Sequence, residues 1–159
     1  MSIEIPPTQG YVTRIDDADR GFTDGRKWHV AVVPHRNTIY ARTRIDGKSV
    51  YMHKLLAPGW GEVDHVDGDG LNNCRANLRD GTGRGKNHAN RGMRTDNTNT
   101  FKGICRAGSG RWYARIHVNG KKFHLGMYDT PEAAAEAYDR AAVHYFGEYA
   151  KTNAMLALL

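Results

Sequence analysis

The chain has 159 residues, a hydrophobic content of 40% and a formal net charge of +6. No apolar run reaches the ~18 residues that a membrane helix needs, and the first residues lack the basic start and apolar core of a signal peptide. We therefore expect no membrane partner. Two cysteines exclude a disulfide framework, so we expect a cytoplasmic protein.

Positive charge is concentrated in one part of the chain. Residues 75–122 hold twelve Lys and Arg against two acidic residues, so this block carries +10 and the remaining residues carry −4. A basic block of this kind can neutralise phosphates and release condensed counterions, which indicates a nucleic-acid partner. A surface that is merely solvated is the alternative interpretation.

Residues 1–49 are predicted to be strand-rich. An apolar, β-branched run at 28–33 and a partly alternating run at 38–45 have the composition of strands. Asp46-Gly47 follows as a strong hairpin signal, so we expect a returning strand at 49–53. Three basic residues surround this hairpin: Arg42, Arg44 and Lys48. They could contact DNA, although a solvated sheet face explains them at least equally well.

The stretch 63–79 contains the residue types that point to catalysis. Asp64 and His65 end a short apolar run that is predicted to be a strand, and neighbouring strand side chains point to opposite sides. Asn77 follows the histidine by twelve residues. A second polar cluster, at 87–91, begins ten residues later on a predicted short helix.

These spacings can build a nuclease site with a single metal ion. The carboxylate of Asp64 can bind a hard cation such as Mg²⁺, together with an amide oxygen and a substrate phosphate. The neutral imidazole of His65, with an ordinary pKa of ~6.5, is suited to take the proton of an attacking water. The metal would polarise the phosphoryl oxygen and stabilise the departing 3′ oxygen. Asn77 would orient the loop and the histidine ring.

The same residues have structural interpretations. Adjacent Asp and His are common in turns. Several loop residues resemble a calcium loop: Asp67, Asp69, Asn72 and Asn73. The glycine and terminal glutamate positions of that loop do not match, so turn chemistry explains them better. Cys74 with His65 and His88 would give three zinc ligands without close spacing, and Cys74 is better explained as a small packing residue.

From residue 101 the pattern predicts three strands followed by a helix. The strands are expected at 101–106, 111–118 and 121–126, the last two joined by Asn119-Gly120, which favours a type I′ turn. Thr130 is the expected helix N-cap, with Pro131 at the first helical position and Gly147 as the C-cap. One helix face is apolar: Ala134, Ala137, Tyr138, Ala141 and Tyr145.

Basic and aromatic residues on and beside these strands are the candidate DNA contacts. They are Arg91, Lys102, Arg106, Arg111, Trp112, Arg115, Lys121, Lys122 and His124. Strand alternation puts Arg111, Tyr113 and Arg115 on one face, and a basic, aromatic sheet face fits a DNA groove. The alternative is that Trp112 packs in the core while the arginines are only solvated.

Two family resemblances follow from these motifs. Residues 50–91 resemble the HNH endonucleases of the phage free-standing or homing type, in the segments Tyr51-Met52-His53-Lys54, Val63-Asp64-His65-Val66-Asp67-Gly68, Leu71-Asn72-Asn73, Asn77-Leu78-Arg79 and Asn87-His88-Ala89-Asn90-Arg91. Residues 101–153 resemble an AP2-type DNA-binding domain, in the segments Lys102-Gly103-Ile104, Trp112-Tyr113-Ala114-Arg115-Ile116, Leu125-Gly126, Tyr128-Asp129-Thr130-Pro131-Glu132-Ala133-Ala134, Ala137-Tyr138-Asp139 and Asn153.

The HNH resemblance implies a ββα-metal fold and phosphodiester hydrolysis that leaves a 5′ phosphate. It makes His65 the general base, Asp64 a ligand of one divalent ion (Mg²⁺, with Mn²⁺ possible), and Asn77 the central asparagine of the motif. The glycine-rich segment 80–86 is one residue longer than the usual pattern. The second metal ligand is therefore open between Asn87, which we favour, and His88.

We therefore expect an α+β protein with a strand-rich region at 1–49, an HNH core at 50–92, a linker at 93–100, an AP2-like sheet and helix at 101–153, and a tail at 154–159. The predicted function is a metal-dependent endonuclease that nicks or cuts double-stranded DNA, as a monomer or homodimer, in the cytoplasm of a phage-infected bacterium. The alternative is a non-catalytic DNA-binding or regulatory protein with a decayed HNH core. A small zinc module is a third interpretation, which the scarcity of cysteines disfavours.

Overall fold

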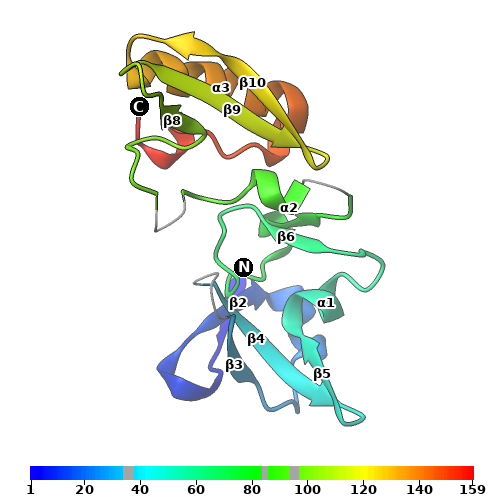
Figure 1. The fold of residues 1–159 in the computed structure, drawn as a ribbon. Coiled ribbons are helices and arrows are strands. Elements are labelled where there is room, and N and C mark those ends of the chain that lie inside the picture. Colours follow the sequence, from blue (N-terminus) through cyan, green and yellow to red (C-terminus); the bar gives the residue numbers. More distant parts are fainter. Residues whose placement is uncertain (34–37, 84–85, 94–96) are drawn as a thin grey trace. The chain divides into compact units, whose positions relative to one another are not determined.

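The computed structural model describes residues 1–33, 38–83, 86–93 and 97–159, without the side chains of residues 87 and 88. The chain forms two compact units, Met1–Thr82 and Gly83–Leu159, and most of their helices and strands are labelled in Figure 1. All described sheets are antiparallel, which confirms the mixed α+β class. Within the described ranges, no helix is long and apolar enough to cross a membrane.

The largest sheet of the first unit has the order β3-β4-β5, with bounds His29–Val33, Thr38–Ile45 and Lys48–Tyr51. Asp46 and Gly47 both have positive φ (49° and 75°), which confirms the predicted hairpin turn. The expected strand at 49–53 ends early, because helix α1 (Met52–Leu56) begins there. Met52 and Leu56, one helical turn apart, are both buried in the core of this unit.

A second sheet of the first unit was not expected from the sequence. It pairs β1 (Ser2–Ile5) with β2 (Thr13–Asp16), around the 3₁₀ turn η1 (Thr8–Gly10). A further 3₁₀ helix, η2 (Asp17–Phe22), follows β2. Ile15 is fully buried, so this sheet contributes to the core of the unit.

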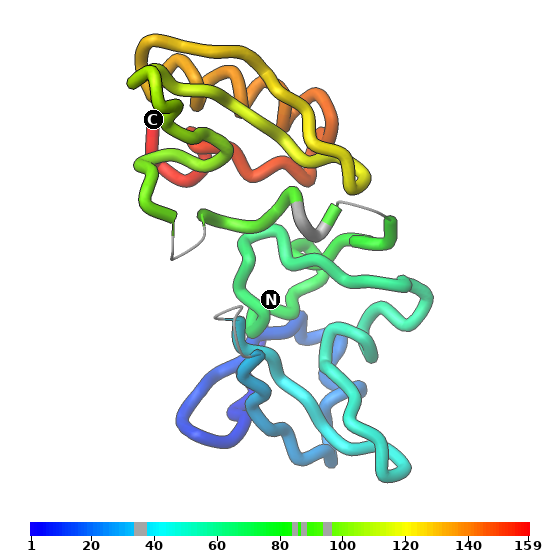
Figure 2. The backbone as a smooth tube through the Cα atoms, viewed as in Figure 1, coloured from blue at the N-terminus to red at the C-terminus, as the bar shows by residue number. Residues whose placement is uncertain are grey.

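The strands β6 (Val63–His65) and β7 (Leu78–Asp80) pair with Asp64 opposite Arg79. The 3₁₀ helix η3 (Arg75–Asn77) leads into β7, and Figure 2 traces the backbone through the loop between the two strands.

That loop is held on β2 by main-chain hydrogen bonds. The Arg14 amide donates to the Leu71 carbonyl at 2.9 Å, and the Asn73 amide donates to the Arg14 carbonyl at 2.7 Å. The Asn73 side chain, fully buried, also donates to Thr13 Oγ1 at 2.9 Å. Hydrogen bonds between residues about sixty positions apart in the chain therefore hold the loop in place.

The second unit is a three-stranded sheet covered on one face by a helix (Figure 1). Its elements are α2 (Lys86–Ala89), β8 (Ile104–Arg106), β9 (Trp112–Val118), β10 (Lys121–Tyr128), α3 (Pro131–Phe146), η4 (Gly147–Tyr149) and η5 (Ala154–Leu156). The sheet order is β10-β9-β8. This arrangement matches the sheet and helix expected of an AP2-like domain.

The ends of α3 are formed by the residues that the sequence predicts. Thr130 Oγ1 accepts a hydrogen bond from the Ala133 amide at 3.2 Å, Pro131 starts the helix, and Gly147 ends it with φ of 53°. Alanines line the buried face, as expected, but Tyr145 is 42% exposed. Its ring stacks on Phe123 at the edge of the sheet instead, with 5.6 Å between ring centroids.

The helix lies close to the sheet at Gly103. This residue has φ of 81°, and a Cβ there would lie 1.9 Å from the Tyr138 ring. The ββα-metal core expected at 50–92 is not shown by this structure. The predicted domain limits at residues 50, 93, 101 and 154 also stay predictions.

Candidate nucleic-acid interface

The sheet of the second unit has one face against α3 and one open face. In β9, Ala114 and Ile116 are 0% and 2% exposed and pack in the core beneath the helix. Because strand side chains alternate, Tyr113, Arg115 and His117 lie on the opposite face. This confirms the predicted alternation within the strand.

Antiparallel register extends the open face across the sheet. Arg115 lies opposite His124, His117 opposite Lys122, and Tyr113 opposite both Met127 and Cys105. We call these residues the sheet face: Cys105, Tyr113, Arg115, His117, Lys122, His124 and Met127. A β-bulge between His124 and Gly126 keeps His124 beside the tyrosine.

Aromatic contacts order the centre of the sheet face. The rings of Tyr113 and His124 stack at 5.7 Å with an interplanar angle of 16°. The Arg115 guanidinium lies 5.9 Å from the centroid of the Tyr113 ring. The Cys105 thiol, through a hydrogen bond, raises the pKa of the Tyr113 hydroxyl. A stacked platform with a guanidinium beside it can present charge to a partner at low cost in side-chain entropy.

Charge in this unit is divided between its two layers. The strands β8, β9 and β10 contain no Asp or Glu and four Lys or Arg: Arg106, Arg115, Lys121 and Lys122. Helix α3 contains three acidic residues, Glu132, Glu136 and Asp139, and one arginine. The sheet layer is therefore electropositive and the helix layer electronegative.

Four candidate DNA contacts do not belong to the sheet face. Arg111 precedes β9 and pairs with Asp129 at 2.7 Å, so it lies outside the strand in which we expected it. Arg106 is exposed, and its guanidinium lies 5.9 Å from the Trp112 ring. Trp112 is half-buried and packs against the core under α3. Lys121 is exposed at the start of β10.

Lys102 has an internal position. Its Nζ donates to three main-chain carbonyls, those of Ala89 at 3.2 Å, Arg91 at 2.7 Å and Lys151 at 2.9 Å. Burial lowers the pKa of Lys102 to about 8. Its ammonium group therefore joins segments of the second unit to each other, while the Arg91 side chain is exposed. A groove of about 500 Å³ beside β8 is lined by parts of Arg91, Lys102 and Arg115.

In the first unit, the carboxylate of Asp64 forms an ion pair. Its Oδ2 accepts from Arg79 Nε at 2.7 Å, and both side chains are largely buried. Sequence reasoning gave Arg79 no part in the site, although an arginine that follows Asn77 by two residues is readily found in the motif.

The imidazole of His65 is buried among polar and aromatic groups. Its Nε2 lies 3.2 Å from Asn73 Oδ1, and its ring lies 5.2 Å from His53 and 5.8 Å from Tyr40. Burial lowers the pKa of His65, and burial lowers that of His53 to about 3. Within the described chain, His53 Nδ1 is buried without a hydrogen-bond partner. His53 and Asn73 were not among the predicted site residues, although both lie in segments that carry the HNH resemblance.

Asn77 stabilises the loop between β6 and β7. Its Nδ2 donates to Asp67 Oδ1 at 2.9 Å and to the Asn72 carbonyl at 2.8 Å, and its Oδ1 accepts from the Asp67 amide at 3.0 Å. Asn73, rather than Asn77, contacts the ring of His65. The hydrogen bonds that Asp67 accepts lower the pKa of its carboxyl group despite partial burial.

The expected metal site is only partly described. The side chains of Asn87 and His88 lie outside the described residues. Among the residues that are described, no group of three or more His, Cys, Asp or Glu could hold a metal ion. The carboxylate of Asp64, the predicted oxygen ligand, is paired with Arg79, and the Mg²⁺ or Mn²⁺ ion stays a prediction. Cys74 is a half-buried free thiol, and burial raises its pKa.

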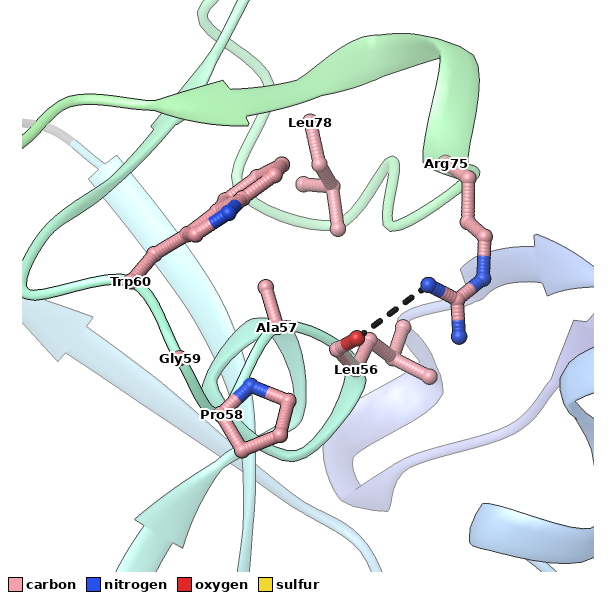
Figure 3. A pocket seen from close by; sticks show the side chains of 7 residues that line it. All are labelled: Leu56, Ala57, Pro58, Gly59, Trp60, Arg75 and Leu78. Atoms are coloured by element: carbon pink, nitrogen blue, oxygen red, sulfur yellow. Dashed lines mark hydrogen bonds between the residues drawn. The ribbon is translucent and has the colours of Figure 1, made fainter.

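A separate pocket of about 250 Å³ lies within the first unit (Figure 3). Its lining is mostly apolar, with Leu56, Trp60 and Leu78 around it. The guanidinium of Arg75 reaches its edge and donates to the Leu56 carbonyl at 3.3 Å, while Asp19 pairs with it at 2.7 Å. No predicted site residue lines this pocket.

Comparison with known proteins supports an AP2-like DNA-binding domain. The chain is 39% identical over 74 residues to an ethylene-responsive transcription factor, ERN1, from Medicago truncatula. It is 47% identical over 55 residues to APETALA2-like protein 2 of Oryza sativa subsp. indica, and 50% identical over 56 residues to the ethylene-responsive transcription factor WRI1 of Arabidopsis thaliana. No family model matches the chain.

These alignments cover part of each protein. They include 45% of this chain for the Medicago protein and 33% for each of the other two. The chain spans 28% of the length of the first relative and 13% of the other two.

The comparison corrects the predicted activity. The expected phage-type HNH endonuclease, a phosphodiester hydrolase, is wrong, because these relatives are plant proteins, two of them named as transcription factors, and none is named as a nuclease. The pairing of Asp64 with Arg79 gives a structural reason why an adjacent Asp and His can be present in a chain without such an activity.

Proposed function

We propose that this chain is a non-enzymatic protein that binds double-stranded DNA through the sheet face of its second unit. One observation carries the proposal: the three strands hold four cationic side chains, two of them (Arg115 and Lys122) on the sheet face, and no carboxylate, while α3 behind them carries three acidic residues. Similarity to AP2-type transcription factors supports it. The alternative of a non-catalytic DNA-binding protein thus becomes the main interpretation.

The physical basis is neutralisation of phosphates. Each cation that contacts a DNA phosphate releases condensed counterions, and this favours binding at low salt. A two- or three-stranded antiparallel sheet can enter a groove of the duplex, where its outward side chains reach phosphates and base edges. The electronegative helix layer disfavours the opposite orientation, in which α3 would face the DNA.

Individual roles follow from the contacts. Arg115 lies beside the stacked rings of Tyr113 and His124, near the centre of the sheet face. Its planar guanidinium is suited to bidentate hydrogen bonds with DNA. Lys122 is exposed and makes a phosphate contact. Lys102 acts indirectly, because its ammonium group holds the segments beside β8 in place.

The test is titration of a fluorescent 20-base-pair duplex of random sequence with the full chain. We expect Arg115→Ala to weaken binding by about tenfold and to lower the salt slope of the affinity by ~1. The matched control is Arg140→Ala, which removes the same charge from α3, where Arg140 is exposed and only 3.7 Å from Glu136. Equal affinity losses in the two variants would contradict the assignment of the sheet face.

The absence of catalysis is tested separately. Supercoiled plasmid incubated with the wild-type chain and Mg²⁺ or Mn²⁺ should remain supercoiled. Cleavage by the wild type that disappears in His65→Ala would overturn the non-enzymatic assignment and leave the DNA-binding assignment untouched.

A further inference from the structure

We infer that the first unit carries a second contact surface for the backbone of duplex DNA, on the open face of the β3-β4-β5 sheet. We call it the hairpin face and define it by His29, Arg42, Arg44, Ser49 and Tyr51. The inference rests on the proposed function, because it takes as given that the chain binds duplex DNA.

Burial shows which side of this sheet is open. In β4, Ala41 and Thr43 are 1% and 3% exposed, whereas the alternating residues Arg42 and Arg44 are exposed. Ala41 packs in the core of the unit, so the two arginines lie on the side away from it. Residues two positions apart on a strand are ~7 Å apart, which lets each guanidinium reach a different phosphate.

Strand register places suitable neighbours beside the arginines. Arg42 lies opposite His29 on one side and Tyr51 on the other, and Arg44 lies opposite Ser49. Imidazole, phenol and hydroxyl groups are all donors that proteins use on phosphate oxygens. The face therefore combines charge with neutral donors.

An aromatic cluster supports one end of the hairpin face. The Tyr51 ring stacks on His53 at 5.4 Å with an interplanar angle of 7°, and the Tyr40 ring meets it edge-on at 5.6 Å. Gly70 fits against Tyr40 so closely that a Cβ there would lie 2.5 Å from the ring. These contacts limit the motion of Tyr51 next to Arg42.

Ion pairing elsewhere in the unit leaves this face positive. The first unit has eleven Lys and Arg and eleven Asp and Glu, so its net charge is zero. Among the described residues of this unit, four arginines have carboxylate partners: Arg14, Arg20, Arg75 and Arg79. Among the described residues no ion pair involves Arg42, Arg44 or Lys48. Local charge complementarity therefore favours a polyanion at this position.

Duplex DNA is the occupant to which the structure points most directly. Once the sheet face of the second unit binds a duplex, the covalent link raises the effective concentration of the same duplex around the first unit. Two arginines then add affinity through phosphates, without a need for sequence recognition.

The experiment compares salt slopes of the full chain on a random-sequence 40-base-pair duplex. We expect Arg42→Ala/Arg44→Ala to lower the slope of log affinity against log salt by ~2, because two phosphate contacts are lost. The matched control is Arg14→Ala/Arg20→Ala, which removes the same charge from exposed side chains of the same unit. Arg42→Lys/Arg44→Lys should restore most of the slope, since phosphate contacts need charge more than geometry.

The outcomes separate this inference from the proposed function. Suppose that Arg42→Ala/Arg44→Ala has the same salt slope as its control while Arg115→Ala/Lys122→Ala loses binding. The assignment of DNA binding to the hairpin face is then wrong, and the proposed function stands. If Arg115→Ala/Lys122→Ala also binds normally, the proposed function is wrong. A slope change seen on a 40-nucleotide single strand but not on the duplex would overturn the choice of occupant.

Discussion

The first unit holds eleven Lys and Arg against eleven Asp and Glu, and the second holds twelve against six. In the first unit, carboxylates form ion pairs inside the fold: Asp64 pairs with Arg79, both largely buried, and Asp19, almost fully buried, pairs with Arg75. In the second unit, three of the six acidic residues lie on α3, whereas the three strands hold four cationic residues and no carboxylate. Opposite charges therefore pair inside the fold of the first unit, whereas the sheet layer of the second unit keeps a surplus of positive charge.

The cores of the two units also differ, in how many polar side chains they bury. The second unit has one continuous core between a sheet and an alanine-rich helix, with Ala114, Ala134 and Ala135 fully buried. The first unit has short strands and long loops. Among the described residues it buries eight polar or charged side chains, including Thr13, Asn73 and His65, whereas the second unit buries three. Polar groups inside a fold must be paired, so its stability depends more on specific hydrogen bonds.

Breaking the buried ion pair should have the largest effect on stability. Arg79→Ala leaves the Asp64 carboxylate buried without its guanidinium, and we expect a loss of about 3 kcal/mol in the free energy of unfolding of the first unit. The measurement is urea denaturation. The control Arg20→Ala, at an exposed pair 3.7 Å long, should cost less than about 1 kcal/mol. Similar losses in both variants would mean that the first unit does not depend on buried charge.

In the second unit, overpacking between α3 and the sheet should have the largest effect on stability. Gly103→Ala places a Cβ against the Tyr138 ring at a residue with φ of 81°, so we expect a loss of about 2 kcal/mol. Gly108→Ala is the control, because nothing lies within 4 Å of its Cβ position. Hydrogen exchange of the amides in β9 reports the change. A neutral Gly103→Ala would show that helix and sheet can separate freely.

Lowering the pH should destabilise the first unit more than the second. The loss in free energy of unfolding per pH unit should be smaller than the loss caused by either substitution. The unfolded chain protonates His53 below about pH 6.5, whereas burial keeps this residue neutral in the fold to about pH 3. The free energy of unfolding of the first unit should therefore fall as pH falls through this window, by about 1.4 kcal/mol per pH unit at most for this histidine. The lowered pKa of His65 acts in the same direction.

The measurement is hydrogen exchange of both units between pH 7 and pH 4.5. His53→Gln should flatten the pH dependence of the first unit. The histidines of the second unit whose side chains the structure describes, His117, His124 and His144, are exposed. If the second unit loses stability first, buried neutral histidines do not decide the acid response.

Local sequence patterns were sufficient for most elements of the second unit. Asn119-Gly120 forms the predicted turn, with positive φ at both residues, and the caps of α3 are those predicted from Thr130, Pro131 and Gly147. Alternation along β9 also identified which residues face outward. These features depend on a residue and its near neighbours in the chain, so the sequence alone determines them.

The partners of charged and polar side chains were decided by the tertiary structure. Sequence reasoning assigned Lys102 to DNA, yet its ammonium group bonds carbonyls that lie up to 49 positions away. It predicted that Asn77 orients the ring of His65, yet Asn73 contacts this ring. The Asn73 side chain is in turn hydrogen-bonded to Thr13, 60 positions away in the chain. The sheet of β1 and β2, which anchors that loop, was missed altogether. Local patterns set the backbone and the face of each residue, whereas the partner of a polar group depends on which distant segment folds against it.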